Sequence, residues 1–348
     1  MSHYYGDYPD YNSDDDAVFV DIDINALKFN ALKFNVLSLS EDTPTLEIYN
    51  TKEIHRINSS EIVEICIRSD ISPTKCSCRT SYKFTTIHFG NTEVIDFSKY
   101  IFIKTVEVIH IECECIADFS LFENVDTVYV NEDAINVNNL KLPKSLRVLW
   151  INVNNSLALM TFPENLQELL FSNTVTYPPT DIIFPESLQY IDFGGIQSLV
   201  GIILPKYITK IEVCCTTLLS IDDVILPESL TDLIIDSQAP KSECVGKMFS
   251  IPSKFTYVEL SYTHLTYMSF PPILHELWIR GDIISLNDLP NGIQELTVSN
   301  VEEDVTNLSC TLQKIKVTCM DASDIRKKFK KLPYKCIVTD SDDHIILR

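Results

Sequence analysis

One arrangement of apolar and polar residues recurs along most of the chain. It consists of an apolar residue, a proline, two variable residues and then the frame apolar-x-x-apolar-x-apolar, as in LPKSLRVLWI at residues 142–151. Because apolar and polar residues alternate within the frame, each copy predicts a short β-strand with one buried face. In eight copies that carry the proline, the frame begins at Leu146, Leu166, Leu188, Ile208, Leu230, Phe255, Leu274 and Ile293.

The same frame continues beyond these copies without the proline. It begins at Ile62, Phe84, Val106 and Val125 on the N-terminal side and at Leu312 on the C-terminal side, and TPTLEI, from Thr43, is a degraded copy. Strands repeated at intervals of roughly 21 residues cannot be joined as tight hairpins, so we expect them to be parallel. One unit cannot bury its apolar face alone, whereas stacked units can. The pattern therefore predicts thirteen or fourteen stacked units.

The fold class that follows is an α/β solenoid that is mostly β. We expect a curved horseshoe with a parallel sheet on the concave side and short extended or 3-10 outer segments, because the connections contain few helix-like runs. Proline ends each outer segment, since it fixes φ and donates no hydrogen bond. Residues 323–333, SDIRKKFKKLP, predict a C-terminal cap helix. Ser323 would begin this helix, Ile325, Phe329 and Leu332 would share its buried face, and Pro333 would end it.

Four segments divide the chain. Residues 1–17 alternate tyrosine with aspartate and predict a disordered acidic tail, with a docking or phosphorylatable segment as the alternative. Residues 18–42 form the expected N-terminal cap. Residues 43–320 hold the repeats, and residues 321–348 provide the cap helix and a last strand from YKCIVTD.

These repeats resemble those of the leucine-rich repeat superfamily. The proline-containing form is most similar to the repeats of bacterial effector proteins and to the FNIP-type repeats of amoebae, and the resemblance covers roughly residues 43–340. It implies a horseshoe that binds other proteins. Most such repeats carry an asparagine eight residues after the first frame residue. Here Asn154 occupies that position in one unit, but Thr174, Ile196 and Thr216 replace it in others.

Function is expected on the concave face. The third, fifth and seventh frame residues point to that face, and Trp150 and Trp278 both occupy fifth positions. Exposed aromatic residues bordered by charged ones are typical of a protein-binding surface. The alternative is that the rings only pack on one another and stiffen the sheet. The candidate binding residues are His88, His110, Tyr129, Trp150, Leu170, Tyr190, Tyr257, Trp278, Asp192, Glu212, Glu259 and Arg280.

Charge and composition narrow the expected partners. The formal net charge of −21 disfavours nucleic acid and anionic membranes, and it favours a protein partner with some basic surface. We expect a monomeric, non-enzymatic scaffold or adaptor, with a regulatory subunit that positions or inhibits an enzyme as the alternative. Eleven cysteines without a signal segment indicate reduced thiols and a cytoplasmic protein.

Catalytic and metal chemistry have weak signals. The pairs Cys76/Cys78 and Cys113/Cys115 lack the CxxC spacing typical of zinc sites, so we predict no metal and no cofactor. Cys66, His88 and His110 fall in one row and could form a nucleophile–base arrangement. The face of a solenoid is shallow and excludes water poorly, so we predict no catalytic residues.

Overall fold

The computed structural model describes residues 45–48, 64–68, 86–90, 106–111, 118–131 and, with gaps, 140–348. The side chains of the first three strands are not among the described features. The predicted acidic tail, 1–17, and N-terminal cap, 18–42, lie outside the described residues, so those segment boundaries stay predictions.

The main element is a sheet of 16 strands in the order β1 to β10, then β12 and β14 to β18. Every neighbouring pair from β1 to β17 is parallel, which confirms the predicted solenoid. The strands are β1 Thr45–Ile48, β2 Glu64–Arg68, β3 Thr86–Gly90, β4 Val108–Ile111, β5 Thr127–Val130, β6 Val148–Ile151, β7 Glu168–Phe171, β8 Tyr190–Asp192, β9 Lys210–Cys214, β10 Asp232–Asp236, β12 Tyr257–Ser261, β14 Glu276–Ile283, β15 Glu295–Val301, β16 Lys314–Val317, β17 Ile337–Thr339 and β18 Ile345–Leu347.

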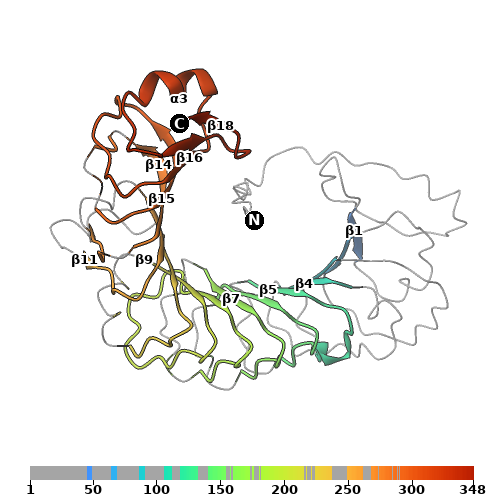
Figure 1. Cartoon of the computed structure of the whole chain (residues 1–348). Helices are drawn as coiled ribbons and strands as arrows, with labels where there is room; N and C mark the ends of the chain where they lie inside the picture. Colours follow the sequence, from blue (N-terminus) through green and yellow to red (C-terminus); the bar gives the residue numbers. More distant parts are fainter. Residues whose placement is uncertain are drawn as a thin grey trace, which may run out of the picture.

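The strands follow a curved arc and line its inner side (Figure 1). The outer connections hold little regular structure among the described residues. They include the 3-10 turn η5, Phe119–Leu121, and a two-stranded parallel ribbon of β11, Phe249–Ser250, with β13, Met268–Ser269. None of the described helices has the length and hydrophobicity needed to cross a membrane.

The core fills the space between the sheet and the outer connections. The first, fourth and sixth frame residues of one unit, Leu146, Leu149 and Ile151, are fully buried, as the frame predicts. The proline shapes the entry to each strand, because the Leu146 amide donates to the Pro143 carbonyl at 3.3 Å. The same turn recurs at Pro163, Pro185 and Pro227. The same turn thus precedes the strand in each of these proline-bearing units, and the strands of these units pair in register.

The C-terminal cap helix differs from the prediction. Helix α3 spans Ala322–Lys328 with Asp321 at its N-cap, so Ser323 lies inside the helix rather than at its start. Ile325 and Phe329 are buried as expected. The helix ends well before Pro333 because the chain pairs with Val305 instead: the Val305 amide donates to the Lys328 carbonyl at 2.8 Å, and the Lys330 amide donates to the Val305 carbonyl at 3.0 Å.

A shortened repeat follows the helix. The Cys336 amide donates to the Pro333 carbonyl at 3.0 Å, which is the turn found in the other units, and β17 pairs in parallel with β16. Lys335, within this turn, has a φ of 64°, a conformation that non-glycine residues rarely adopt. The final strand β18 then pairs with β17 in the antiparallel direction, which the sequence did not predict. It is the last strand of the sheet.

Candidate functional site

The fifth frame residues form a continuous row across the inner face. His110 lies opposite Tyr129, Tyr129 opposite Trp150, and Trp150 opposite Leu170 in neighbouring parallel strands. The row continues through Asp192, Glu212 and Glu259 to Trp278, with Ile234 between the two glutamates. The repeat frame therefore identified which residues the fold places side by side.

Three aromatic rings of this row pack in series. The rings of His110 and Tyr129 are stacked, with centroids 4.5 Å apart and planes 9° apart. The rings of Tyr129 and Trp150 are tilted by 36° with centroids 6.0 Å apart. All three side chains are half-buried. Stacking therefore holds each ring in place while one part of it stays accessible.

Trp278 occupies the equivalent position farther along the row. Its side chain is half-buried, and its indole N–H is enclosed without a hydrogen-bond partner among the described residues. The strand register places Glu259 on one side and Thr297 on the other. Neither tryptophan is sealed inside the core.

Cys66 and His88 belong to the same row. The register pairs Cys66 with His88, and His88 with His110. The side chains of Cys66 and His88 lie outside the described features, so the row supports their proximity along the backbone and no further geometry.

Several predicted site residues are more buried than an exposed strip requires. Leu170, Asp192, Glu212 and Glu259 are each less than 10% exposed. The carboxylate of Asp192 accepts a hydrogen bond from the Gly194 amide at 2.8 Å. These residues therefore contribute to the packing of the fold, and they also border the inner surface.

Two tyrosines of the third frame position hold buried carboxylates. The Tyr190 hydroxyl donates to Glu212 at 2.5 Å, and the Tyr257 hydroxyl donates to Glu259 at 2.9 Å. Burial, together with the negative charge of Glu259, raises the pKa of Tyr257 far above its ordinary value. The Tyr257 phenol thus stays protonated. Both hydroxyls serve as donors, and buried carboxylates need such partners.

Most bases of the inner face are engaged within the chain. Arg280 forms an ion pair with Glu259 at 2.6 Å, and the Lys210 ammonium lies 4.5 Å from the centre of the Tyr190 ring. Lys314 and Lys316 both contact Asp343, at 2.9 and 2.8 Å. Their hydrogen bonds lower the pKa of Asp343 to about 2.

Asp343 was not a predicted site residue. It lies in the turn between β17 and β18, outside the repeat frame, so no periodic signal in the sequence connects it with Lys314 or Lys316. Because of this turn, both C-terminal lysines of the inner face share one carboxylate, which offsets one of their two positive charges.

Two further carboxylates, Glu276 and Glu295, lie nearby, and Lys314 is opposite Glu295 in the next strand. Glu276 is directly opposite Glu295 in the adjacent strands β14 and β15, and neither forms an ion pair within the described part of the chain. Burial raises the pKa of Glu276, and the negative charge of Glu295 raises it further. Glu276 also lines a shallow hollow of about 610 Å³ together with Asp232, Tyr257, His275, Thr256 and Lys210.

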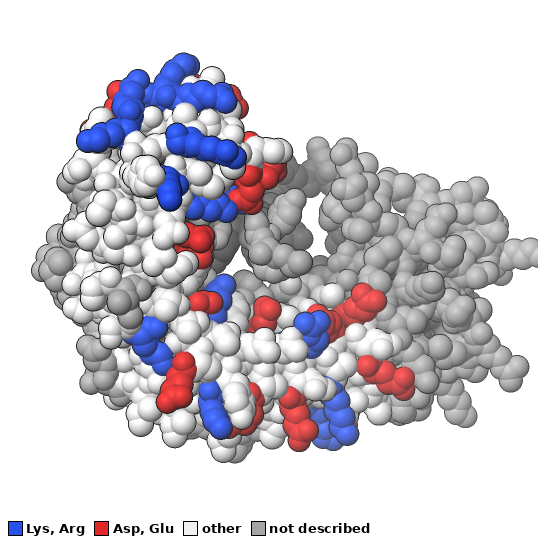
Figure 2. Space-filling model, in the orientation of Figure 1, with Lys and Arg blue, Asp and Glu red and all other residues white. Residues whose placement is uncertain are grey.

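Charged side chains are unevenly placed over the molecule. Figure 2 shows basic residues gathered over the C-terminal cap at one end of the arc, with acidic and basic residues interspersed along the rest of the visible face. Arg326, Lys327, Lys330 and Lys331, all exposed, belong to this cap. Lys327 is paired with Asp324 at 2.8 Å.

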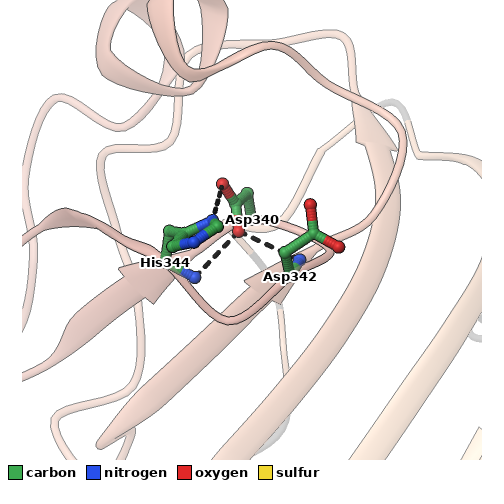
Figure 3. Close-up of side chains that lie close together, drawn as sticks. All are labelled: Asp340, Asp342 and His344. Carbon is green, nitrogen blue, oxygen red and sulfur yellow. Dashed lines mark hydrogen bonds and ion pairs between the residues drawn. The ribbon is translucent and has the colours of Figure 1, made fainter.

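Three potential metal ligands meet in the β17–β18 turn (Figure 3). Ligand atoms of Asp340, Asp342 and His344 lie within 4.8 Å of one another. The Asp340 carboxylate, however, accepts hydrogen bonds from the backbone amides of Asp342 at 3.0 Å and His344 at 2.8 Å. The arrangement is explained by a hydrogen-bonded turn, and we assign no metal to it.

An apolar row on the outer connections is not among the predicted features. Ile183, Ile203 and Ile225 each stand two residues before the proline of consecutive units, and their side chains are 91%, 82% and 91% exposed. A signal was available in the sequence, because the same position is polar in neighbouring copies, for example Lys141 and Thr161.

No family model and no curated protein matches this chain. Among solved structures, the chain is similar to the crystal structure of a circular leucine-rich repeat protein, CroV588, with 16% sequence identity and a TM-score of 0.42. The match covers 80% of this chain and 49% of that one, so this chain spans about half its length. The strand register described above makes this chain a leucine-rich-repeat-like parallel solenoid.

Proposed function

We propose that the chain is an interaction scaffold that holds a protein partner on the inner face of its arc, and that the partner presents a basic segment there. The observation that carries this proposal is the composition of that face. A rigid aromatic stack of His110, Tyr129 and Trp150 shares it with the carboxylates Glu276 and Glu295. Among the described residues of that face, the bases Lys210, Arg280, Lys314 and Lys316 all have partners within the chain.

Each part has a distinct physical role in such binding. Accessible rings that are already fixed in place lose little conformational entropy on binding, and tryptophan and tyrosine often carry most of the binding energy. Glu276 and Glu295 repel each other at close range. A partner lysine or arginine beside them would relieve this repulsion and would be attracted from a distance. The aromatic stack would then provide most of the binding affinity. The carboxylates would provide selectivity and a faster association rate.

The first experiment isolates the aromatic stack. A partner captured from the native source is purified and its binding to the purified chain is measured by calorimetry. We expect Trp150→Ala to weaken binding at least about tenfold, because a central aromatic anchor contributes roughly 2 kcal/mol or more. Leu121→Ala, a partly exposed residue of the outer turn η5, serves as the control and should bind as the wild type does.

The second experiment isolates the carboxylates. We expect Glu276→Gln and Glu295→Gln to slow association and to reduce its dependence on salt, since steering by charge acts mainly on the association rate. Unchanged affinity in Trp150→Ala would refute the aromatic anchor. Association that is independent of salt in the wild type would refute the basic partner.

If the partner is an enzyme whose activity changes on binding, the chain is a regulatory subunit that uses the same face.

A further inference from the structure

The C-terminal cap concentrates positive charge in a chain that is otherwise strongly acidic. Six of the 28 lysines and arginines fall within residues 326–335, and residues 325–339 contain no aspartate or glutamate. Figure 2 shows basic side chains gathered over this cap, at one end of the arc. Since the whole chain has a net charge of −21, the segment is opposite in sign to the rest of the molecule. We call these bases the basic cap patch: Arg326, Lys327, Lys328, Lys330, Lys331 and Lys335.

The fold accounts for only part of this charge. Cations in the last turn of a helix are stabilised by its dipole, which explains the three bases that end α3. Lys330, Lys331 and Lys335 lie beyond the helix, and all three are exposed. Packing in this segment comes from Phe329 and Cys336, which are buried. Neither the helix nor the core therefore requires a positive charge at the last three positions.

Three bases of the patch have partners within the chain, and these partners offset their charge only in part. Lys327 contacts the Asp324 carboxylate at 2.8 Å, and both side chains are exposed. Lys330 approaches the Asp304 carboxylate only to 3.9 Å. Lys328 donates to a backbone carbonyl, which carries no net charge. Exposed ion pairs of this kind contribute little stability, so a binding partner can replace them at small cost.

The other three bases, Arg326, Lys331 and Lys335, form no ion pair with any residue that the structure describes. The Lys335 ammonium lies 5.3 Å from the centre of the Tyr334 ring, and Tyr334 is itself 88% exposed. Tyrosine often carries binding energy where two proteins meet. The patch therefore presents unpaired positive charge beside one exposed aromatic ring.

We propose that the basic cap patch binds an acidic segment of a protein partner, rich in aspartate and glutamate. A short segment can pair with the patch alone, whereas a nucleic acid duplex or an anionic membrane extends farther and would be repelled by the acidic remainder of the chain. Five of the six bases are lysines. Arginine, with its planar fork of donors, is the more usual residue for phosphate recognition, so the composition favours carboxylates.

This surface is distinct from the inner face to which we assign a basic partner. The cap lies at one end of the arc, whereas the strands line its inner side (Figure 1). The two surfaces prefer partners of opposite charge. Such a chain can hold two proteins at once, which is what an adaptor does.

The test measures binding of a fluorescently labelled oligoglutamate peptide to the purified full chain, by anisotropy at physiological ionic strength. We expect the wild type to bind, and Lys331→Glu combined with Lys335→Glu to weaken binding at least about tenfold, because like charges would then face each other. Lys144→Glu combined with Lys206→Glu is the matched control. It reverses two exposed lysines in other units, changes the net charge by the same amount and should bind as the wild type does.

Several results would overturn the proposal. A wild-type chain that does not bind the peptide would do so, and an equal loss in both double variants would attribute binding to net charge. Tighter binding of single-stranded oligothymidylate, or of phosphatidylserine vesicles, would assign the patch to nucleic acid or to membranes. Thermal unfolding checks that both variants fold. None of these outcomes depends on the inner-face partner, because the probe is acidic and that partner is basic.

Discussion

Titratable side chains of the C-terminal units differ mainly in their exposure to water and in the charges beside them. Asp343 is exposed but is held by two lysines, so its pKa falls to about 2. Glu276 is partly buried and faces another glutamate, so its pKa rises. The Cys336 thiol is buried beneath the last repeat, which raises its pKa to about 11 and keeps it protonated. Residue type alone therefore does not define the chemistry of these positions.

Glu276 provides a residue-scale prediction. Its folded pKa lies above the ordinary value of 4.5, so between these two values the folded chain binds more protons than the unfolded chain. The free energy of unfolding therefore falls as pH rises through this range. We expect Glu276→Gln to raise the melting temperature near neutral pH by about 1 to 2 °C and to have little effect below pH 4.5.

Circular dichroism melts across the acidic and neutral range provide the measurement. Glu303→Gln, at an exposed position away from the inner face, is the control for loss of one negative charge. A similar gain in both variants would attribute the effect to net charge and would contradict the local explanation.

At the scale of one unit, the proline turn and the close approach of neighbouring units determine the stacking. The first frame residue donates to the proline carbonyl, and the strand then pairs with the unit before it. Gly194 lies where two units come close. It has a φ of 49°, and a side-chain carbon added there would lie 2.1 Å from the Phe171 carbonyl oxygen. Only glycine fits this place.

Replacing Gly194 tests this stacking. We expect Gly194→Ala to lower the free energy of unfolding by about 2 kcal/mol or more, since a strained φ and a backbone collision act together. Gly281→Ala is the matched control: Gly281 has a φ of 89°, but no atom lies within 4 Å of the added carbon. It should cost about 1 kcal/mol, from the backbone conformation alone. Denaturant titration measures both, and equal losses would show that the collision is relieved by a small shift.

At the scale of the molecule, the last units protect the end of a long sheet. Parallel strands leave unpaired backbone groups at each edge, and an exposed edge invites pairing with other chains. Here β18 turns back and pairs with β17, and its residues Ile346 and Leu347 pack against the core. The same turn carries Asp343, so one feature both adds the last strand of the sheet and pairs with Lys314 and Lys316.

Removing this strand gives a prediction for the whole molecule. We expect a chain that ends after Thr339 to form large aggregates, because the edge of β17 is then unpaired. Light scattering during gentle warming is the measurement. Asp343→Asn is the control, since it frees the two lysines but keeps β18. If Asp343→Asn aggregates equally, charge rather than the sheet edge is responsible.

The sequence by itself determined the repeat, the parallel sheet, the buried frame positions and the residues that share the fifth-position row. These follow from local periodicity: a strand repeated at a nearly constant interval can bury its apolar face only by stacking in register. Only the tertiary structure decided how each row residue is used. Three features join residues that have no periodic relation in the sequence. They are the pairing of the chain with Val305 where α3 ends, the antiparallel strand β18 and the contacts of Asp343. The burial of three carboxylates of the row also depends on the curvature and packing of whole units, and so does the exposure of three isoleucines on the outer connections. The carboxylates are those of Asp192, Glu212 and Glu259, and the isoleucines are Ile183, Ile203 and Ile225.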